Sequence, residues 1–291
     1  MEVCMAAKLR RNRKDDGNGS SSERDFREIN GRKIPGLNNN SIPVYFQPIF
    51  SAKDGTIYGY EALTRIEGEN SSVAASKLFQ KAKQINAVSS LDYLYLANVV
   101  RRAADLGLTR KDIFLFINVS PDTLTSPVYR VDEIGGLIER WGMVKGKIVF
   151  EVTVESVIRN YDFLKQAITY YKNSGYLIAI DNFRASYKGL KMLSFIEPDI
   201  IKIDRQFLNT MRINFSFIYR VISVCQRIGI KVIATGIEKE EEMEDVLTMD
   251  IELLQGDHLG KPFSLTSGEL STIPERQRKN KESARKGVRC K

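Results

Sequence analysis

Ile113-Phe114-Leu115-Phe116-Ile117 is a wholly apolar run, and a polar residue, Asn118, follows it directly. A short run of this kind is typical of a strand that is buried on both faces of a parallel sheet. The pattern recurs further along the chain, each time with a polar residue at its end: Lys147–Phe150 before Glu151, Leu177–Ile180 before Asp181, Asp199–Ile201 before Lys202, Lys231–Ala234 before Thr235 and Ile251–Leu254 before Gln255.

A predicted hairpin precedes this series. Val44–Phe50 and Thr56–Leu63 have the composition of strands, and Asp54-Gly55 between them favours a tight turn. Periodic apolar positions predict helices between and after the strands, and Gly107 is a plausible end for the second of them. The expected helices cover residues 75–86, 88–107, 131–142, 161–174, 187–196, 207–228 and 239–248.

Strands that alternate with helices predict an α/β fold with a parallel sheet covered on both faces. Residues 42–274 have about the length of a closed TIM-like (β/α)8 barrel, typically ~250 residues. Because the first hairpin is antiparallel, we expect a barrel with one reversed strand. An open doubly wound sheet is the alternative, but no glycine-rich phosphate loop follows the first strand.

The basic character of the chain lies in its tails. The net charge is +8, of which residues 1–41 carry +3 and residues 275–291 carry +6, which leaves −1 for the region between them. Residues 1–41 have few apolar positions, so we expect a mostly disordered basic N-terminal tail, and a basic C-terminal tail at 275–291. Such tails can contact nucleic acid or an anionic membrane, but solvated tails explain the charge as simply, and we do not expect either contact.

The rest of the composition predicts a soluble cytoplasmic protein. Cys4, Cys225 and Cys290 have no paired spacing and are expected to be reduced thiols. No apolar run approaches the ~20 residues of a membrane span. The N-terminus lacks the apolar centre of a signal peptide.

Four polar residues at predicted strand ends have the chemistry of a metal site. Glu61 lies in Tyr58-Gly59-Tyr60-Glu61-Ala62-Leu63-Thr64-Arg65, and the barrel would bring it together with Asn118, Glu151 and Asp181 at one end. Carboxylate and amide oxygens are the ligands that Mg²⁺ or Mn²⁺ prefers. Each residue alone could equally be a strand-end hydrogen-bonding group, so the prediction rests on the four together.

The order of short motifs along the core resembles the EAL domain family, whose members hydrolyse or bind cyclic di-GMP. The resemblance covers about residues 42–264. It rests on Gln47-Pro48-Ile49, Glu61-Ala62-Leu63 with Arg65, Asn118-Val119-Ser120, Glu151-Val152-Thr153, Asp181-Asn182-Phe183, Lys202-Ile203-Asp204, Gly236-Ile237-Glu238, Gln255-Gly256 and Lys261-Pro262.

The resemblance implies a set of roles. In the family, two divalent ions activate a water that attacks one phosphodiester of the dinucleotide. It implies Mg²⁺ or Mn²⁺ as cofactor, the four strand-end residues as ligands of the first ion, and Lys202 as a catalytic residue that holds the attacking water or the phosphate. The implied ligand-binding residues are Gln47, Glu61, Leu63, Arg65, Asp204, Glu238, Gln255 and Pro262.

Several positions depart from the family pattern. Asn182 replaces the second aspartate of a pair, so the second metal site loses an anionic ligand, and we expect it to stay empty. Thr235 replaces a catalytic glutamate. Arg184 and Ser186 stand where the nearby loop usually has glycines. Val154 stands where a further glutamate is usual, with Glu155 one residue later, and Asp257 replaces an aromatic residue.

Three functions remain open at this point. The departures favour a degenerate domain that acts as a non-catalytic or very weakly active cyclic di-GMP receptor. The alternatives are an active metal-dependent cyclic di-GMP phosphodiesterase and a fold-only module that acts through a protein partner, and a homodimer is also open. His258, the one histidine, is expected to be a loop residue rather than a base.

Overall fold

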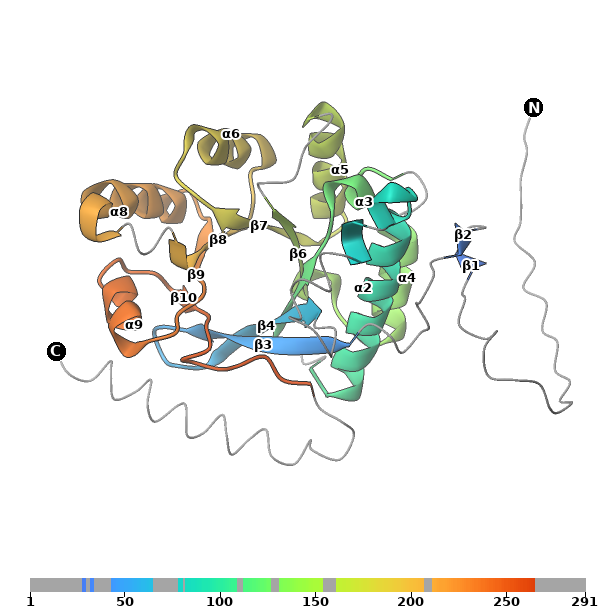
Figure 1. The fold of residues 1–291 in the computed structure, drawn as a ribbon, viewed down its shortest axis with the longest axis horizontal. Coiled ribbons are helices and arrows are strands. Elements are labelled where there is room, and N and C mark those ends of the chain that lie inside the picture. Colours follow the sequence, from blue (N-terminus) through green and yellow to red (C-terminus); the bar gives the residue numbers. More distant parts are fainter. Residues whose placement is uncertain are drawn as a thin grey trace, which may run out of the picture.

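The structure is a computed structural model that describes residues 28–29, 32–33, 43–64, 78–80, 82–108, 112–126, 131–153, 161–206 and 211–264. Within these residues, strands close into a barrel and helices lie around its outside (Figure 1). The barrel strands are β3 (Val44–Ser51), β4 (Ile57–Thr64), β5 (Phe114–Asn118), β6 (Ile148–Thr153), β7 (Leu177–Phe183), β8 (Ile200–Ile203), β9 (Lys231–Ala234) and β10 (Leu253–Leu254).

One strand of the barrel is reversed, as the sequence predicts. β3 is antiparallel to both of its neighbours, β4 and β10, while all other neighbouring pairs are parallel. The turn between β3 and β4 forms at Asp54-Gly55, where Gly55 has a φ of 66° and Asp54 Oδ1 accepts a hydrogen bond from the Thr56 N–H. The closed order β10-β3-β4-β5-β6-β7-β8-β9 excludes the open sheet that was the alternative.

The helices follow the predicted order. They are α2 (Val88–Asp105), α3 (Pro121–Leu124), α4 (Val131–Arg140), α5 (Tyr161–Asn173), α6 (Tyr187–Ile196), α8 (Met211–Arg227) and α9 (Glu240–Leu247), with a 3₁₀ turn at Lys145–Lys147. The expected 75–86 helix is helical at 78–80 and 82–84 among the residues described. Helix α3 was not predicted, because it is only one turn long; Ser120 caps it and Pro121 occupies its first position.

Most strands end one to three residues further along the chain than the apolar runs suggested. Asn118, Glu151, Asp181 and Lys202 were expected just after their strands and instead lie within them. The reason is backbone pairing: Asn118 is in register with Glu151, and Asp181 with Thr153. Polar side chains on the inner face of a barrel do not interrupt the hydrogen-bonded ladder.

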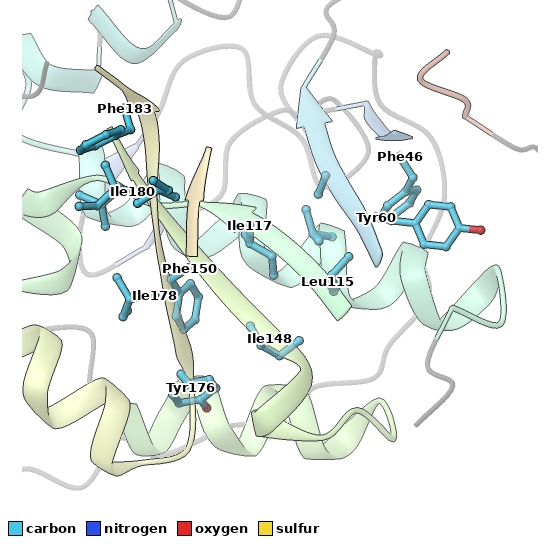
Figure 2. Packing of buried hydrophobic residues seen from close by; sticks show 14 of the residues in the cluster. Phe46, Tyr60, Leu115, Ile117, Ile148, Phe150, Tyr176, Ile178, Ile180 and Phe183 are labelled. Carbon is cyan, nitrogen blue, oxygen red and sulfur yellow. The ribbon is translucent and has the colours of Figure 1, made fainter. Parts of the chain in front are cut away.

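The alternation of side chains along each strand divides the core into two regions. Outward residues of β5, β6 and β7, such as Ile117, Phe150 and Ile180, pack against the surrounding helices (Figure 2). Inward residues form a second apolar cluster that fills the barrel: Ile49, Phe116, Val149, Ala179, Ile200, Ile233 and Leu253. Because side chains alternate with a period of two, the next inward positions toward the carboxyl ends of the strands form a layer above this cluster.

A short element lies where no secondary structure was predicted. β1 (Glu28–Ile29) and β2 (Arg32–Lys33) pair antiparallel as a separate two-stranded sheet within the region expected to be a disordered tail. The sequence between them is Asn30-Gly31, a dipeptide that favours tight hairpins. Otherwise, the predicted N-terminal tail 1–41, the end of the core at 274 and the C-terminal tail 275–291 lie outside the described residues. Among the helices that are described, none has the length and apolarity to cross a bilayer.

Candidate functional site

A polar layer lies directly above the inner apolar cluster, toward the carboxyl ends of the parallel strands. Its residues lie two positions from members of that cluster on the same strands or just beyond their ends: Gln47, Asn118, Glu151, Asp181, Lys202, Thr235 and Gln255. Glu61, from β4, joins the same layer through its contacts across the barrel. Because side chains alternate along a strand with a period of two, the same strands supply both the apolar cluster and the polar layer, and no strand is interrupted.

Lys202 stands at the centre of this layer. Its Nζ lies 2.8 Å from Glu61 Oε2, 2.7 Å from Glu151 Oε1 and 3.9 Å from Asp181 Oδ1. The lysine on β8 thus joins carboxylates from β4, β6 and β7. Only 2% of Lys202 and 1% of Glu151 are exposed, so these charges interact in a medium that screens them weakly.

The pKa values of the two glutamates and the lysine shift in different directions in this cluster. Burial raises the pKa of Glu151 well above its usual value, and the neighbouring charge of Glu61 adds to the rise. Burial also opposes ionisation of Glu61, but the Lys202 ammonium and the Gln255 amide together hold the pKa of Glu61 below its usual value. Burial disfavours the charged form of Lys202, yet the carboxylates of Glu151 and Glu61 raise its pKa. One ammonium, that of Lys202, thus faces more than one carboxylate, and burial of Glu151 favours its protonated form.

Amide side chains extend the cluster around the barrel wall. Gln255 Nε2 donates to Glu61 Oε2 at 2.6 Å and to Gln47 Oε1 at 3.2 Å. Gln47 Nε2 donates in turn to Asp257 Oδ1 and to the Gly260 carbonyl. On the other side, Asn118 Nδ2 donates to Glu61 Oε1 at 3.3 Å. These bonds fix the orientation of Glu61 from both sides.

The donor set fits a hard divalent cation. Glu61, Asn118, Glu151 and Asp181 offer oxygen ligands, and Glu151 Oε2 is buried without a hydrogen-bond partner among the described residues. Across those same residues, no three His, Cys, Asp or Glu side chains are already spaced as a metal cage, and the Lys202 ammonium stands between the carboxylates. A cation would therefore displace the ammonium from its central contacts.

The side of the site formed by β7, β8 and β9 has a different character. Asn182, with a left-handed φ of 53°, donates from Nδ2 to Asp181 Oδ2 at 3.0 Å. Arg184 Nη2 lies 3.2 Å from Asp204 Oδ2 and donates to Gln206 Oε1 at 2.7 Å. Thr235 Oγ1 donates to the Ile203 carbonyl at 3.2 Å, so the hydroxyl is bound to the barrel wall.

The structure brings together most, though not all, of the predicted site residues. Glu61, Asn118, Glu151, Asp181, Lys202, Gln47 and Gln255 are joined by the contacts above. Leu63 and Pro262 are half-buried near the same end, whereas Arg65, Val154 and Glu155 lie outside the described residues. Glu238 forms an ion pair with Arg205, which also binds Glu242. His258 lies in the loop after β10, 3.2 Å from Glu240 Oε2.

Two features of the site were not predicted from the sequence. One is the Arg184–Asp204 pair. The other is Asp92 on α2, a buried carboxylate that accepts hydrogen bonds from the Ser120 N–H at 2.9 Å and the Thr123 hydroxyl at 2.6 Å. Asp92 thereby fixes the loop that follows Asn118. The helix-capping residues Ser120 and Pro121 were the available signal for this loop.

Comparison with known proteins adds a family and named relatives. The model of the family described as the EAL domain matches residues 32–262. The chain is 28% identical to the cyclic di-GMP phosphodiesterase PdeF of Escherichia coli K12 over 82% of this chain and 32% of that protein. It is 29% identical to the blue light- and temperature-regulated antirepressor BluF of the same organism, over 74% of this chain and 53% of that protein. The chain thus spans a third to a half of these relatives.

Among solved structures, BlrP1 of Klebsiella pneumoniae in a complex with calcium and cyclic di-GMP has the same fold. The match has a TM-score of 0.68 and 26% identity, and it covers 78% of this chain and 57% of that one. The residues that the family model matches, 32–262, include all the strands of the barrel.

Proposed function

This chain belongs to the EAL domain family, and we propose that it is a cyclic di-GMP receptor domain with little or no phosphodiesterase activity. PdeF is named for that nucleotide, and BlrP1 was solved with it. The proposal is that the same ligand binds this chain at the polar layer, at the end of the barrel that we call its mouth.

One observation carries the proposal. The buried cluster around Lys202 is complete, whereas the position of the family's catalytic glutamate holds Thr235, whose hydroxyl donates to the Ile203 carbonyl. A threonine has no charge at neutral pH and cannot accept a proton as a carboxylate does. Loss of a general base costs about 10²–10⁴ in rate. This arrangement supports a site that binds the ligand and turns it over slowly or not at all.

The cofactor expected in this site is Mg²⁺ or Mn²⁺. Glu61, Asn118, Glu151 and Asp181 would hold one ion, which would supply positive charge to a phosphate oxygen. Gln47, Gln255 and Arg65 would contact the nucleotide. Lys202 would orient a water or a phosphate oxygen, but as a buried ammonium paired with carboxylates it is a poor base.

Two other functions each have one observation in their favour. The name of PdeF favours an active phosphodiesterase. The name of BluF, an antirepressor, favours a module that acts through a protein partner. A receptor binds the nucleotide without cleaving it, whereas a phosphodiesterase cleaves it and a protein-interaction module does not bind it.

A calorimetric titration with cyclic di-GMP in Mg²⁺ tests the proposal, with Asn118→Ala as the variant. The change removes a donor to Glu61 and a predicted metal ligand, so we expect affinity to fall by about tenfold or more. Asn98→Ala is the matched control, because Asn98 contacts Arg101 on α2 outside the site. Absence of binding by the parent chain would favour the protein-interaction module, and equal binding by Asn118→Ala would place the ligand elsewhere.

A further inference from the structure

The side of the site formed by β7, β8 and β9 is called the open side. Two carboxylates on this side are each bound by an N–H group of this chain. Asp181 accepts from the Asn182 amide, and Asp204 accepts from the Arg184 guanidinium. These carboxylates lie on or just after the neighbouring strands β7 and β8. The chain itself supplies positive charge to both carboxylates, because Lys202 Nζ lies 3.9 Å from Asp181 Oδ1 and Arg184 Nη2 lies 3.2 Å from Asp204 Oδ2.

The backbone of Arg184 is held in one place. Its carbonyl accepts a hydrogen bond from the Ser186 N–H at 2.7 Å. Gly189 packs so closely against that carbonyl that an added Cβ would come within 1.9 Å of it. The guanidinium therefore extends from a fixed loop across to Asp204 and Gln206 at the end of β8.

Arg184 still has hydrogen-bonding capacity. A guanidinium carries five N–H donors, and both contacts described use Nη2. Nε and Nη1 have no partner in the part of the chain that the structure describes. The side chain is 45% exposed, so a ligand at the barrel mouth can reach it. Arginine is also well suited to phosphate, because its planar fork matches two oxygens at once.

We propose that Arg184 is a built-in cation that takes the place of a second divalent ion and binds a phosphate oxygen of a phosphodiester ligand. Asn182 then donates to one oxygen of Asp181 where an anionic ligand of the second ion would stand, and Arg184 pairs with Asp204 and presents positive charge to the ligand. The phosphate-binding part of this inference rests on the proposed function. The replacement of a metal ion by Arg184 does not.

The metal arm of the test uses Mn²⁺ alone, titrated calorimetrically into the parent, Arg184→Gln and Lys188→Gln. Without the guanidinium, Asp204 loses the positive charge that lies 3.2 Å away, so we expect Arg184→Gln to raise the affinity for Mn²⁺ about tenfold or to add a second ion. Lys188 is the matched control, because it is an exposed cation in the first turn of α6 and loses the same charge. Equal affinities in all three proteins would overturn the inference.

The nucleotide arm measures cyclic di-GMP binding in EDTA. We expect Arg184→Gln to weaken binding about tenfold and Lys188→Gln to change it less than about twofold. Equal binding by the parent and Arg184→Gln would overturn the phosphate role. If the parent binds no nucleotide with or without metal, the proposed function fails, and the Mn²⁺ titration still decides whether Arg184 replaces an ion. Circular dichroism and the Tm of each variant verify that it is folded.

Discussion

The two sides of the barrel mouth handle their charges differently. On the side of Glu61 and Glu151, carboxylates are buried and meet one buried ammonium, Lys202. On the side of Asp181 and Asp204, the carboxylates are more exposed and accept hydrogen bonds from Asn182 in β7 and from Arg184 just after that strand. A buried charge cluster depends on every member, whereas we expect a more exposed one to tolerate substitution of its polar partners.

The largest effect is expected when the buried side is broken. Lys202→Met leaves Glu61 and Glu151 without their cation, and removal of one partner from a buried ion pair costs about 3–5 kcal/mol of unfolding free energy. Urea unfolding measures this change. Lys231→Met is the matched control, because Lys231 is about half exposed and its Nζ lies 3.8 Å from the Glu252 carboxylate. Similar losses in both variants would show that Lys202 is not the centre of the cluster.

The next largest effect is expected on the rate of hydrolysis, when the residues usual in the family are restored on the open side. We expect the double change Thr235→Glu with Asn182→Asp to raise hydrolysis of cyclic di-GMP by about a hundredfold, because it supplies a base and an anionic metal ligand. Each single change should give less, since one lacks the second ligand and the other lacks the base. Aspartate tolerates the left-handed backbone at position 182. Chromatographic detection of the linear dinucleotide in Mn²⁺ measures the rate.

If the double variant binds the nucleotide but stays inactive, the loop around Arg184 limits catalysis. The triple variant that adds Arg184→Gln then tests this explanation directly. An unmodified chain that matches the rate of the double variant would contradict the assignment of Thr235 and Asn182.

A smaller effect should appear at Asp92, which supports the buried side from α2. Burial raises the pKa of Asp92, so the stability it contributes is present at low pH and is lost as the pH rises through that raised pKa. Asp92→Asn cannot ionise but loses part of its acceptor capacity, and we expect it to cost about 1 kcal/mol at low pH and less at neutral pH. Unfolding free energies measured across that range test the trend. Asp105→Asn, an exposed change at the end of α2, should show no such trend.

The sequence predicted the barrel and its buried cluster because both follow from the periodicity of strands. Apolar runs ending at Asn118, Glu151 and Asp181 indicated parallel strands, and parallel strands in a barrel bring their carboxyl ends together. The hairpin at Asp54-Gly55 indicated the reversed strand. These features depend on local sequence and on simple geometry.

The open side could not be predicted because it depends on how loops pack. The Arg184–Asp204 pair extends from a loop whose backbone Gly189 approaches closely, and neither the pair nor that approach is indicated by the sequence. The bond from Thr235 to the Ile203 carbonyl likewise depends on where β9 ends beside β8. The pairing of Glu238 with Arg205 also depends on a contact between two loops, and the assignment of Glu238 to the ligand stays a prediction.

The function proposed for this chain is to bind cyclic di-GMP and leave it intact. The most direct measurement mixes stoichiometric protein and cyclic di-GMP in Mn²⁺, measures the bound fraction by equilibrium dialysis, and then analyses the recovered nucleotide by chromatography. We expect a saturable bound fraction in which the nucleotide remains cyclic after a long incubation. Conversion of the recovered nucleotide to its linear form, or no bound nucleotide at all, would contradict the account.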